Sequence, residues 1–193
     1  MAECAHENII KKRITRTFLD HKFSTEGRGC SACGASLWDD KVSDRFYTWL
    51  NNLKINNQRQ YKLSERTDKL LKKFGEQYHC KDESKLIRAI IAVMNSKLSS
   101  PEYNAIFGEL MVSADFKSLD AEPTNISKKV RITSPKSLYD LENWKDINHL
   151  NDSELIRNYI MIILVASKQT NSKFADFWNN QVKGYLEVAL AAA

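Results

Sequence analysis

The sequence predicts an all-α fold, an irregular bundle of about seven to eight helices. Apolar residues recur at helical spacing in most segments, capping residues precede several of these segments, and alternating strand-like patterns are scarce. The composition is that of a globular protein, with 42% apolar and 27% charged residues and only 6 Gly and 3 Pro among 193 residues. A wholly disordered or collagen-like chain is therefore excluded.

The N-terminal part is expected to contain five helices. The first is placed at 7–22, because Ile10, Ile14 and Phe18 recur every four residues and mark one apolar face. A loop rich in Gly and Ser follows at 24–36. The polar stretch 55–61, rich in Asn and Gln, is interpreted as a connector. The other four helices are expected at 40–54, from the cap Ser64 to about 80, from the cap Asp82 to 98, and at 101–113 after Ser100 and Pro101.

The longest irregular stretch is expected at 118–135, which contains two of the three prolines. Within it, Lys129–Thr133 could form a short strand but has no evident partner. Helices are expected after the caps Ser137 and Asn151, and a last one from about 172 to 190. The stretch 118–135 would thus separate a basic helical region, 1–117, from a helical region, 136–193, that packs on it. No internal repeat is evident.

The most informative motif is Cys30-x-x-Cys33-Gly34, since two thiolates at this spacing can hold one Zn²⁺. A structural zinc site needs four ligands in a tetrahedral arrangement. The candidates for the other two positions are Cys4, His6, His21, His79 and Cys80. The predicted site consists of Cys4, Cys30, Cys33 and Cys80, with His79 or His6 as substitutes.

A structural Zn²⁺ at this site would staple the N-terminal region, so that metal loss would unfold that region first. Two alternatives stay open. The cysteines could be plain thiols, or they could form a redox pair, although a redox C-x-x-C normally opens a helix in a βαβ unit that this sequence does not show.

The positive charge is concentrated near the N-terminus. Residues 1–80 contain 15 Lys/Arg and 10 Asp/Glu, against 14 and 14 in residues 81–193. Such an asymmetry is typical of a surface that binds a polyanion. If two of the expected helices lie side by side, their cations would form one stripe for phosphate contacts; these are Lys11, Lys12, Arg13, Arg16, Arg66, Lys69, Lys72 and Lys73.

The function predicted from these features is that of a zinc-stabilised, non-enzymatic accessory or regulatory protein, of viral or other origin. It would bind nucleic acid, preferring RNA or single strands. Phosphate-binding loops and the common hydrolase and metalloprotease motifs are absent from the sequence. Accessory factors of this kind are often oligomeric, so a homo-oligomer is one expected form.

The alternative is a helical adaptor that binds a protein partner, with zinc serving stability alone. Its contact residues would be aromatic side chains, if exposed: Trp38, Tyr47, Trp144 and Tyr185. Salt distinguishes the two, because only polyanion binding collapses as ionic strength rises. The start of the chain has no signal-peptide pattern, and the longest apolar run, 159–166, is too short to span a bilayer. An intracellular, soluble protein of the cytoplasm or nucleus is expected.

Overall fold

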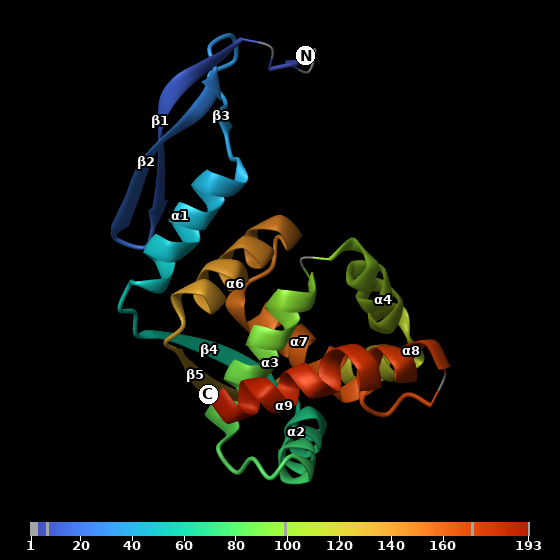
Figure 1. Ribbon diagram of the computed structural model, residues 1–193. Coiled ribbons are helices and arrows are strands. Elements are labelled where there is room, and N and C mark those ends of the chain that lie inside the picture. Colours follow the sequence, from blue (N-terminus) through green and yellow to red (C-terminus); the bar gives the residue numbers. More distant parts are fainter. Residues whose placement is uncertain (1–3, 7, 99, 171, 193) are drawn as a thin grey trace. The chain divides into compact units, whose positions relative to one another are not determined.

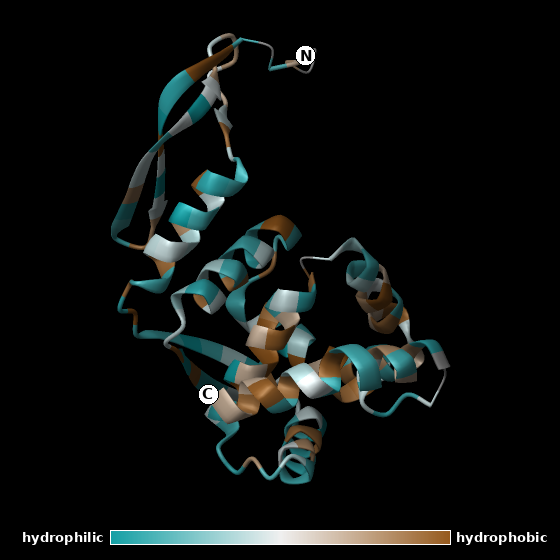
Figure 2. Cartoon of the chain, in the orientation of Figure 1, coloured by the Kyte–Doolittle hydropathy of each residue, from teal (hydrophilic) through white to brown (hydrophobic). Residues whose placement is uncertain are grey.

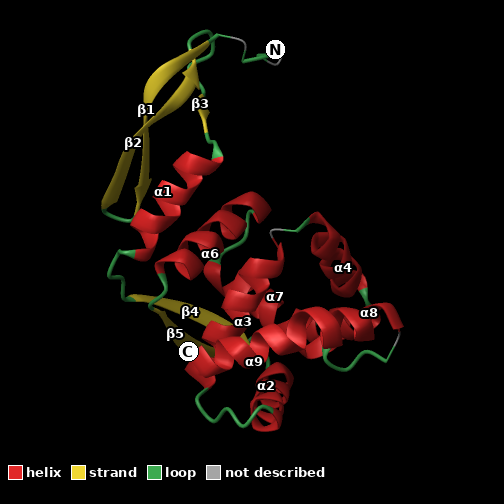
Figure 3. Ribbon diagram, in the orientation of Figure 1, coloured by secondary structure: helices red, strands yellow, loops and turns green. Residues whose placement is uncertain are grey.

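The fold is mixed α/β, so the all-α prediction is wrong. A computed structural model describes residues 4–6, 8–98, 100–170 and 172–192. Of these described residues, 59% are helical and 19% lie in strands, which form two small antiparallel sheets (Figure 3). The strands lie where the sequence predicted a helix (7–22), a loop (24–36), a connector (55–61) and part of the irregular stretch 118–135.

The chain forms two compact units, each assembled from two pieces of chain. Unit 1 comprises residues 1–54 and 134–139, and unit 2 comprises residues 55–133 and 140–193. Figure 2 shows the difference in character between them, since the helices of unit 2 contain long apolar stretches while the strands of unit 1 are mostly polar. The two units are described separately below.

Unit 1 begins with a long hairpin where a helix was expected at 7–22. Strand β1 (Ile9–Phe18) pairs antiparallel with β2 (His21–Cys30), and the short β3 (Ser36–Leu37) extends the sheet (Figure 1). Only Ile14 and Phe18 of β1 are buried. A spacing of four residues returns to the same face in a strand as well as in a helix, so the apolar pattern did not distinguish the two. The many β-branched residues of β1 favour the strand.

Helix α1 (Asp40–Asn51) packs on this hairpin and closes a small aromatic core. The side chain of Asp39 caps its first turn by accepting a hydrogen bond from the Val42 N–H at 2.9 Å. The Phe46 ring lies 5.3 Å from Phe23 and 5.0 Å from Tyr139, both in edge-to-face contacts. These three rings are nearly inaccessible to solvent and hold the hairpin to the helix.

Unit 2 contains the second sheet and the remaining helices, except that the first residues of the helix Pro135–Asn148, as far as Tyr139, belong to unit 1. The stretch 55–61, interpreted as a connector, lies mostly within a strand, and the irregular stretch 118–135 contains the partner of that strand. Ser134, not Ser137, caps the helix that follows, because its Oγ accepts the Ser137 N–H at 3.2 Å. The elements are β4 (Asn57–Leu63), α2 (Glu65–Gln77), α3 (Glu83–Leu98), α4 (Pro101–Val112), α5 (Ala114–Asp120), β5 (Ile126–Ile132), α6 (Pro135–Asn148), α7 (Asp152–Ala166), α8 (Ser172–Phe177), the π-helix η1 (Trp178–Val182) and α9 (Lys183–Ala192).

Helices α3 and α7 form the centre of unit 2. Every residue of α7 from Tyr159 to Ala166 is buried, and its Asn151–Glu154 capping box is complete, as the sequence predicted. Ile90 and Met94 of α3 are fully buried as well. At about 25 cal/mol per Å² of apolar area removed from water, these two helices contribute much of the stability of unit 2.

Unit 2 contains an internal repeat that the sequence reading missed. The order strand, helix, helix occurs twice, as β4–α2–α3 and β5–α6–α7. Placing Asn57, the start of β4, on Ile126, the start of β5, aligns the two repeats without a gap, and the two strands then have the same pattern of burial. This repeat alignment also places Ser84-Lys85-Leu86-Ile87-Arg88 on Ser153-Glu154-Leu155-Ile156-Arg157. Only this short stretch is similar in sequence, which is why the repeat was not recognised.

The two repeats interlock through their strands. β4 pairs antiparallel with β5 over their full length, and each strand packs on the second helix of the other repeat, β4 on α7 and β5 on α3. Gln60 pairs with Lys129, which is its own equivalent in the repeat alignment. A two-fold axis that relates the two repeats would have to pass between these two residues, and the register is consistent with such an axis.

Candidate functional site

A cluster of cysteine and histidine side chains lies at the open end of the β1–β2 hairpin. The pairing of Ile9 with Cys30 brings the segment before β1 beside the turn after β2. In that turn the Gly34 N–H donates to the Cys30 carbonyl at 2.9 Å, and Gly34 has a φ of 73°, which a residue without a side chain adopts easily. The ligand atoms of Cys4, His6, Cys30 and Cys33 all lie within 4.8 Å of one another.

The distances within this cluster fit four ligands around one ion. The Sγ atoms of Cys4 and Cys30 are 3.7 Å apart, and Cys33 Sγ is 3.4 Å from His6 Nδ1. In a tetrahedral zinc site, two sulfurs would lie about 3.8 Å apart and a sulfur and a nitrogen about 3.5 Å apart, given bond lengths of about 2.3 and 2.0 Å. All four cysteines of the chain are free thiols. The cluster could therefore hold a metal ion.

The surroundings of Cys30 favour the thiolate that a metal requires. The backbone N–H of Cys33 and the side chain of His6 lower the pKa of the Cys30 thiol to about 6. For Cys4, the His6 backbone N–H favours the thiolate, but the hydrogen bonds shared with Cys30 and Cys33 outweigh it and raise the pKa. Deprotonating both Cys4 and Cys30 without a cation would thus be unfavourable.

Three of the predicted ligands, Cys4, Cys30 and Cys33, are brought together, and the substitute His6 takes the fourth place. Cys80 and His79 belong to unit 2, beyond the end of α2, where the Cys80 thiol donates to the Asp82 carbonyl at 3.3 Å. His21 lies at the opposite end of the hairpin from Cys30. His6 was only a substitute in the sequence prediction. A helix at 7–22 would not bring His6 beside Cys30, whereas the β1–β2 hairpin does.

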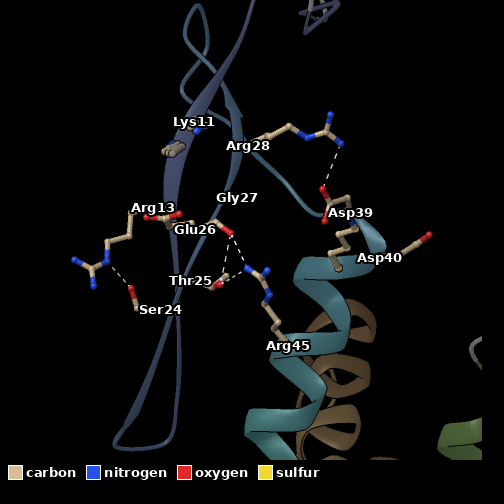
Figure 4. A pocket seen from close by; sticks show the side chains of 12 residues that line it. Lys11, Arg13, Ser24, Thr25, Glu26, Gly27, Arg28, Asp39, Asp40 and Arg45 are labelled. Carbon is tan, nitrogen blue, oxygen red and sulfur yellow. Dashed lines mark hydrogen bonds and ion pairs between the residues drawn. The ribbon is translucent and has the colours of Figure 1, made fainter.

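The predicted cations of the N-terminus lie on β1, not on a helix. A cleft runs between the hairpin and the first turn of α1, and Figure 4 shows Lys11, Arg13, Arg28 and Arg45 around it. Arg28 donates to Asp39 at 3.3 Å, and Arg45 donates to Thr25 at 3.2 Å. Several of these cations are therefore engaged within unit 1.

Two other predicted cations of β1 also have partners within unit 1. Lys12 donates to the Gly34 carbonyl. The Arg16 guanidinium lies 5.0 to 5.6 Å from the rings of Trp38, Phe46 and Tyr139, which is the geometry of a cation–π contact. These two side chains are thus held by the fold of the hairpin.

The other predicted cations lie on α2 in unit 2. Arg66 donates to Glu122 at 3.1 Å, and Lys72 pairs with Asp68 at 2.8 Å, while Lys69 and Lys73 are exposed. The stripe assumed two parallel helices, and that premise is wrong because residues 9–18 form a strand in a different unit.

A second candidate surface is the outward face of the β4–β5 ribbon, which the sequence reading missed. Along both strands exposed polar side chains alternate with side chains that point into unit 2. The exposed set is Gln58, Gln60, Lys62, Ser127, Lys129 and Arg131. Their period-two pattern was visible in Arg59-Gln60-Tyr61-Lys62-Leu63 and in Lys129-Val130-Arg131-Ile132, but each segment is short and the two lie far apart in the sequence.

The inward side of the ribbon anchors it to the helices. Arg59 of β4 pairs with Glu142 and, at 2.7 Å, with Asp152 at the start of α7. Its equivalent Lys128 of β5 pairs with Asp68 and, at 2.6 Å, with Glu83 at the start of α3. These two inward cations have side chains only 16% and 18% exposed, so they hold the ribbon rather than face solvent.

The Tyr61 side chain completes the inward anchoring, because its hydroxyl donates to Glu83 at 2.9 Å. Burial and the neighbouring Glu83 carboxylate raise the pKa of this phenol well above its ordinary value. Tyr61 therefore stays a hydrogen-bond donor at neutral pH and fixes the first turn of α3 against the ribbon.

The aromatic residues expected at a protein interface are distributed over both units. Trp38 and Tyr47 are each 38% exposed, and both contact Phe46 of the aromatic core. Tyr185 of α9 is 54% exposed and lies 3.7 Å from the Lys97 ammonium. Trp144 is half-buried on α6. Trp38 and Tyr47 thus lie beside one core ring in unit 1, and Trp144 and Tyr185 belong to unit 2.

In comparisons with known proteins, no family model, no curated protein and no solved structure matches the chain. Among the described residues, no helix has the length and apolar character needed to cross a membrane.

Proposed function

We propose that this protein is a non-enzymatic nucleic-acid-binding protein that inserts the β4–β5 ribbon into the major groove of duplex DNA. The observation that supports this proposal is the outward face of the ribbon, where exposed polar or cationic side chains alternate with inward-pointing ones along both strands. The B-DNA major groove is about 12 Å wide and admits a two-stranded β-ribbon. Sequence is read there by hydrogen bonds to base edges.

The chemistry of the outward face suits base edges and phosphates. Lys62, Lys129 and Arg131 supply positive charge, and Gln58 and Gln60 supply amide groups that both donate and accept hydrogen bonds. The inward Arg59 and Lys128 are already neutralised by carboxylates. The outward cations are thus the ones available to a ligand.

The same face argues for a duplex over the RNA or single strands that the sequence suggested. Proteins that bind single strands stack bases on aromatic rings, whereas the six outward residues of the ribbon include none. The major groove of A-form RNA is deep and narrow, so side chains on a ribbon cannot read it. Duplex DNA is the form that a rigid, polar, two-stranded ribbon fits best.

For the metal centre we propose Zn²⁺, held by Cys4, His6, Cys30 and Cys33. Three thiolates and one imidazole are a donor set typical of structural zinc sites, and all four positions are filled by protein. The role proposed for the ion is to tie the segment before β1 to the turn after β2. It would close the end of a long hairpin whose pairing there depends on few buried side chains.

The test is to titrate the full chain into a pool of labelled random duplex DNA and to measure binding by fluorescence anisotropy at salt concentrations from 50 to 300 mM. We expect binding that weakens steeply with salt, since each phosphate contact adds about one to the slope of log K against log salt. Lys129→Ala/Arg131→Ala should weaken binding and reduce that slope by one to two. Lys69→Ala/Lys73→Ala, on α2, is the matched control and should leave both nearly unchanged.

The opposite pattern would contradict the ribbon as the binding surface. If the α2 pair weakens binding and the ribbon pair does not, the cations predicted from the sequence are the contact residues. Absence of binding at 50 mM salt, together with a salt-insensitive complex with a protein, would favour the adaptor.

A further inference from the structure

The pairing register of the β4–β5 ribbon is two-fold symmetric in the repeat alignment, but the side chains on its outward face are not. The repeat alignment relates Gln58 to Ser127, Gln60 to Lys129 and Lys62 to Arg131. The inward positions keep their character, since Leu63 and Ile132 are both buried and apolar. The chemical character is thus kept at inward positions such as Leu63 and Ile132 and at the outward cations Lys62 and Arg131, and it differs at the outward pairs Gln58/Ser127 and Gln60/Lys129.

The register places the main difference at the centre of the ribbon. Gln60 and Lys129 lie directly opposite each other, and the approximate two-fold axis passes between them. The Gln60 amide also donates to Ser127 Oγ at 2.6 Å on the other strand, a bond for which the repeat has no counterpart among the bonds of the described residues. Both ends of the face have a cation, Lys62 on one strand and Arg131 on the other.

These side chains favour different bases. A glutamine amide donates and accepts, which matches N6 and N7 of adenine. Lysine and arginine only donate, which matches O6 and N7 of guanine. A serine hydroxyl can form a hydrogen bond with either base. The centre of β4 is therefore suited to an A·T pair, and the centre of β5 to a G·C pair.

We propose that one chain of this protein reads a non-palindromic duplex site, with an adenine contacted from Gln60 on β4 and a guanine contacted from Lys129 on β5. This inference rests on the proposed DNA-binding function. Both strands of the ribbon come from the same chain, so no second copy is needed to complete the reading face, and the two half-sites need not be alike.

The test is a selection of bound duplexes from a library with a random central segment, carried out with the full chain, followed by sequencing and Kd measurement. We expect an asymmetric site with guanine in one half and adenine in the other. Exchanging either central pair should weaken binding about tenfold. Native mass spectrometry should find one chain per duplex.

Three variants locate the preference. Gln60→Lys should select guanine in both halves, and Lys129→Gln should select adenine in both halves, so each site becomes more nearly palindromic. The double variant Gln60→Lys/Lys129→Gln keeps the net charge. It should retain the overall affinity and salt slope while moving the central guanine to the other half relative to the flanking bases.

The outcomes are distinct for the two proposals. Binding to a palindromic site, binding by two chains per site, or binding with no base preference at the centre overturns the asymmetric reading and leaves DNA binding intact. Failure to bind any duplex at low salt overturns the proposed function and this inference with it.

Discussion

Units 1 and 2 are stabilised by different kinds of core. Unit 1 has about sixty residues, a two-stranded hairpin, one complete helix and a small aromatic core around Phe46. Unit 2 is more than twice as long and buries two central helices, α3 and α7. A unit of sixty residues buries a smaller fraction of its surface and commonly needs a metal or disulfide to fold. The comparison teaches that three of the four cysteines lie together in the unit with the smaller core.

The largest expected effect comes from removing the metal. Cys30→Ser/Cys33→Ser, or a strong chelator, should release one Zn²⁺ and expose the amides of β1 and β2 to exchange, while α3 and α7 stay protected. Structural zinc binds zinc-finger peptides with about 10–16 kcal/mol, and each 1.4 kcal/mol changes exchange about tenfold. Native mass spectrometry and hydrogen exchange resolved along the chain would measure both.

Cys80→Ser is the matched control for that experiment, because Cys80 is a free thiol of unit 2 outside the cluster. It should leave zinc content and hairpin protection unchanged. A hairpin that stays protected after zinc is removed would show that the aromatic core suffices for unit 1.

The second effect is specific to unit 2. Ile91 and Ile160 are equivalent in the repeat alignment, and both are almost inaccessible to solvent. Truncating either to Ala should reduce the free energy of unfolding by about 2–5 kcal/mol through lost transfer energy and a cavity. Urea unfolding would measure this, with the exposed Val188→Ala as a control expected within about 0.5 kcal/mol. Loss of zinc from Ile160→Ala would contradict independent stabilisation of the units.

The third effect compares ion pairs of the two units. Arg59→Met removes the guanidinium from the half-buried carboxylates of Glu142 and Asp152 and leaves Lys145 as their cation, so we expect unit 2 to lose about 2 kcal/mol. Arg28→Met in unit 1 removes a pair whose arginine is 60% exposed and should cost less than about 1 kcal/mol. Chemical unfolding of both variants would measure the difference, and equal losses would show that burial does not govern these pairs.

The smallest effect depends on pH. Burial opposes the charge of Asp68, but hydrogen bonds from Lys128 and Lys72 outweigh it and lower the pKa of this carboxyl below 3.8. A lowered pKa stabilises the fold above pH 3.8, and the contribution is lost as pH falls through the folded-state value. Asp68→Asn should therefore destabilise unit 2 by about 1–2 kcal/mol at pH 7 and by progressively less below pH 3.8. A deficit independent of pH would point to packing rather than charge.

The sequence by itself determined the local features of this protein. Helix starts at Ser64 and Asn151 were predictable because capping is a contact between residues three apart. The apolar run of α7 predicted its burial, and Cys30-x-x-Cys33 predicted a cluster of thiols, since both patterns lie within one short segment.

Tertiary structure decided the features that depend on contacts between segments far apart in the sequence. The four-residue spacing of β1 fits a helix and a strand equally, and only pairing with β2 resolved it. β4 and β5 are each too short to be evident alone, and they form a ribbon because the fold brings together two segments that are far apart in the chain. His6 replaced Cys80 for the same reason: a ligand set depends on which segments meet in space, and segment pairing is not a local property.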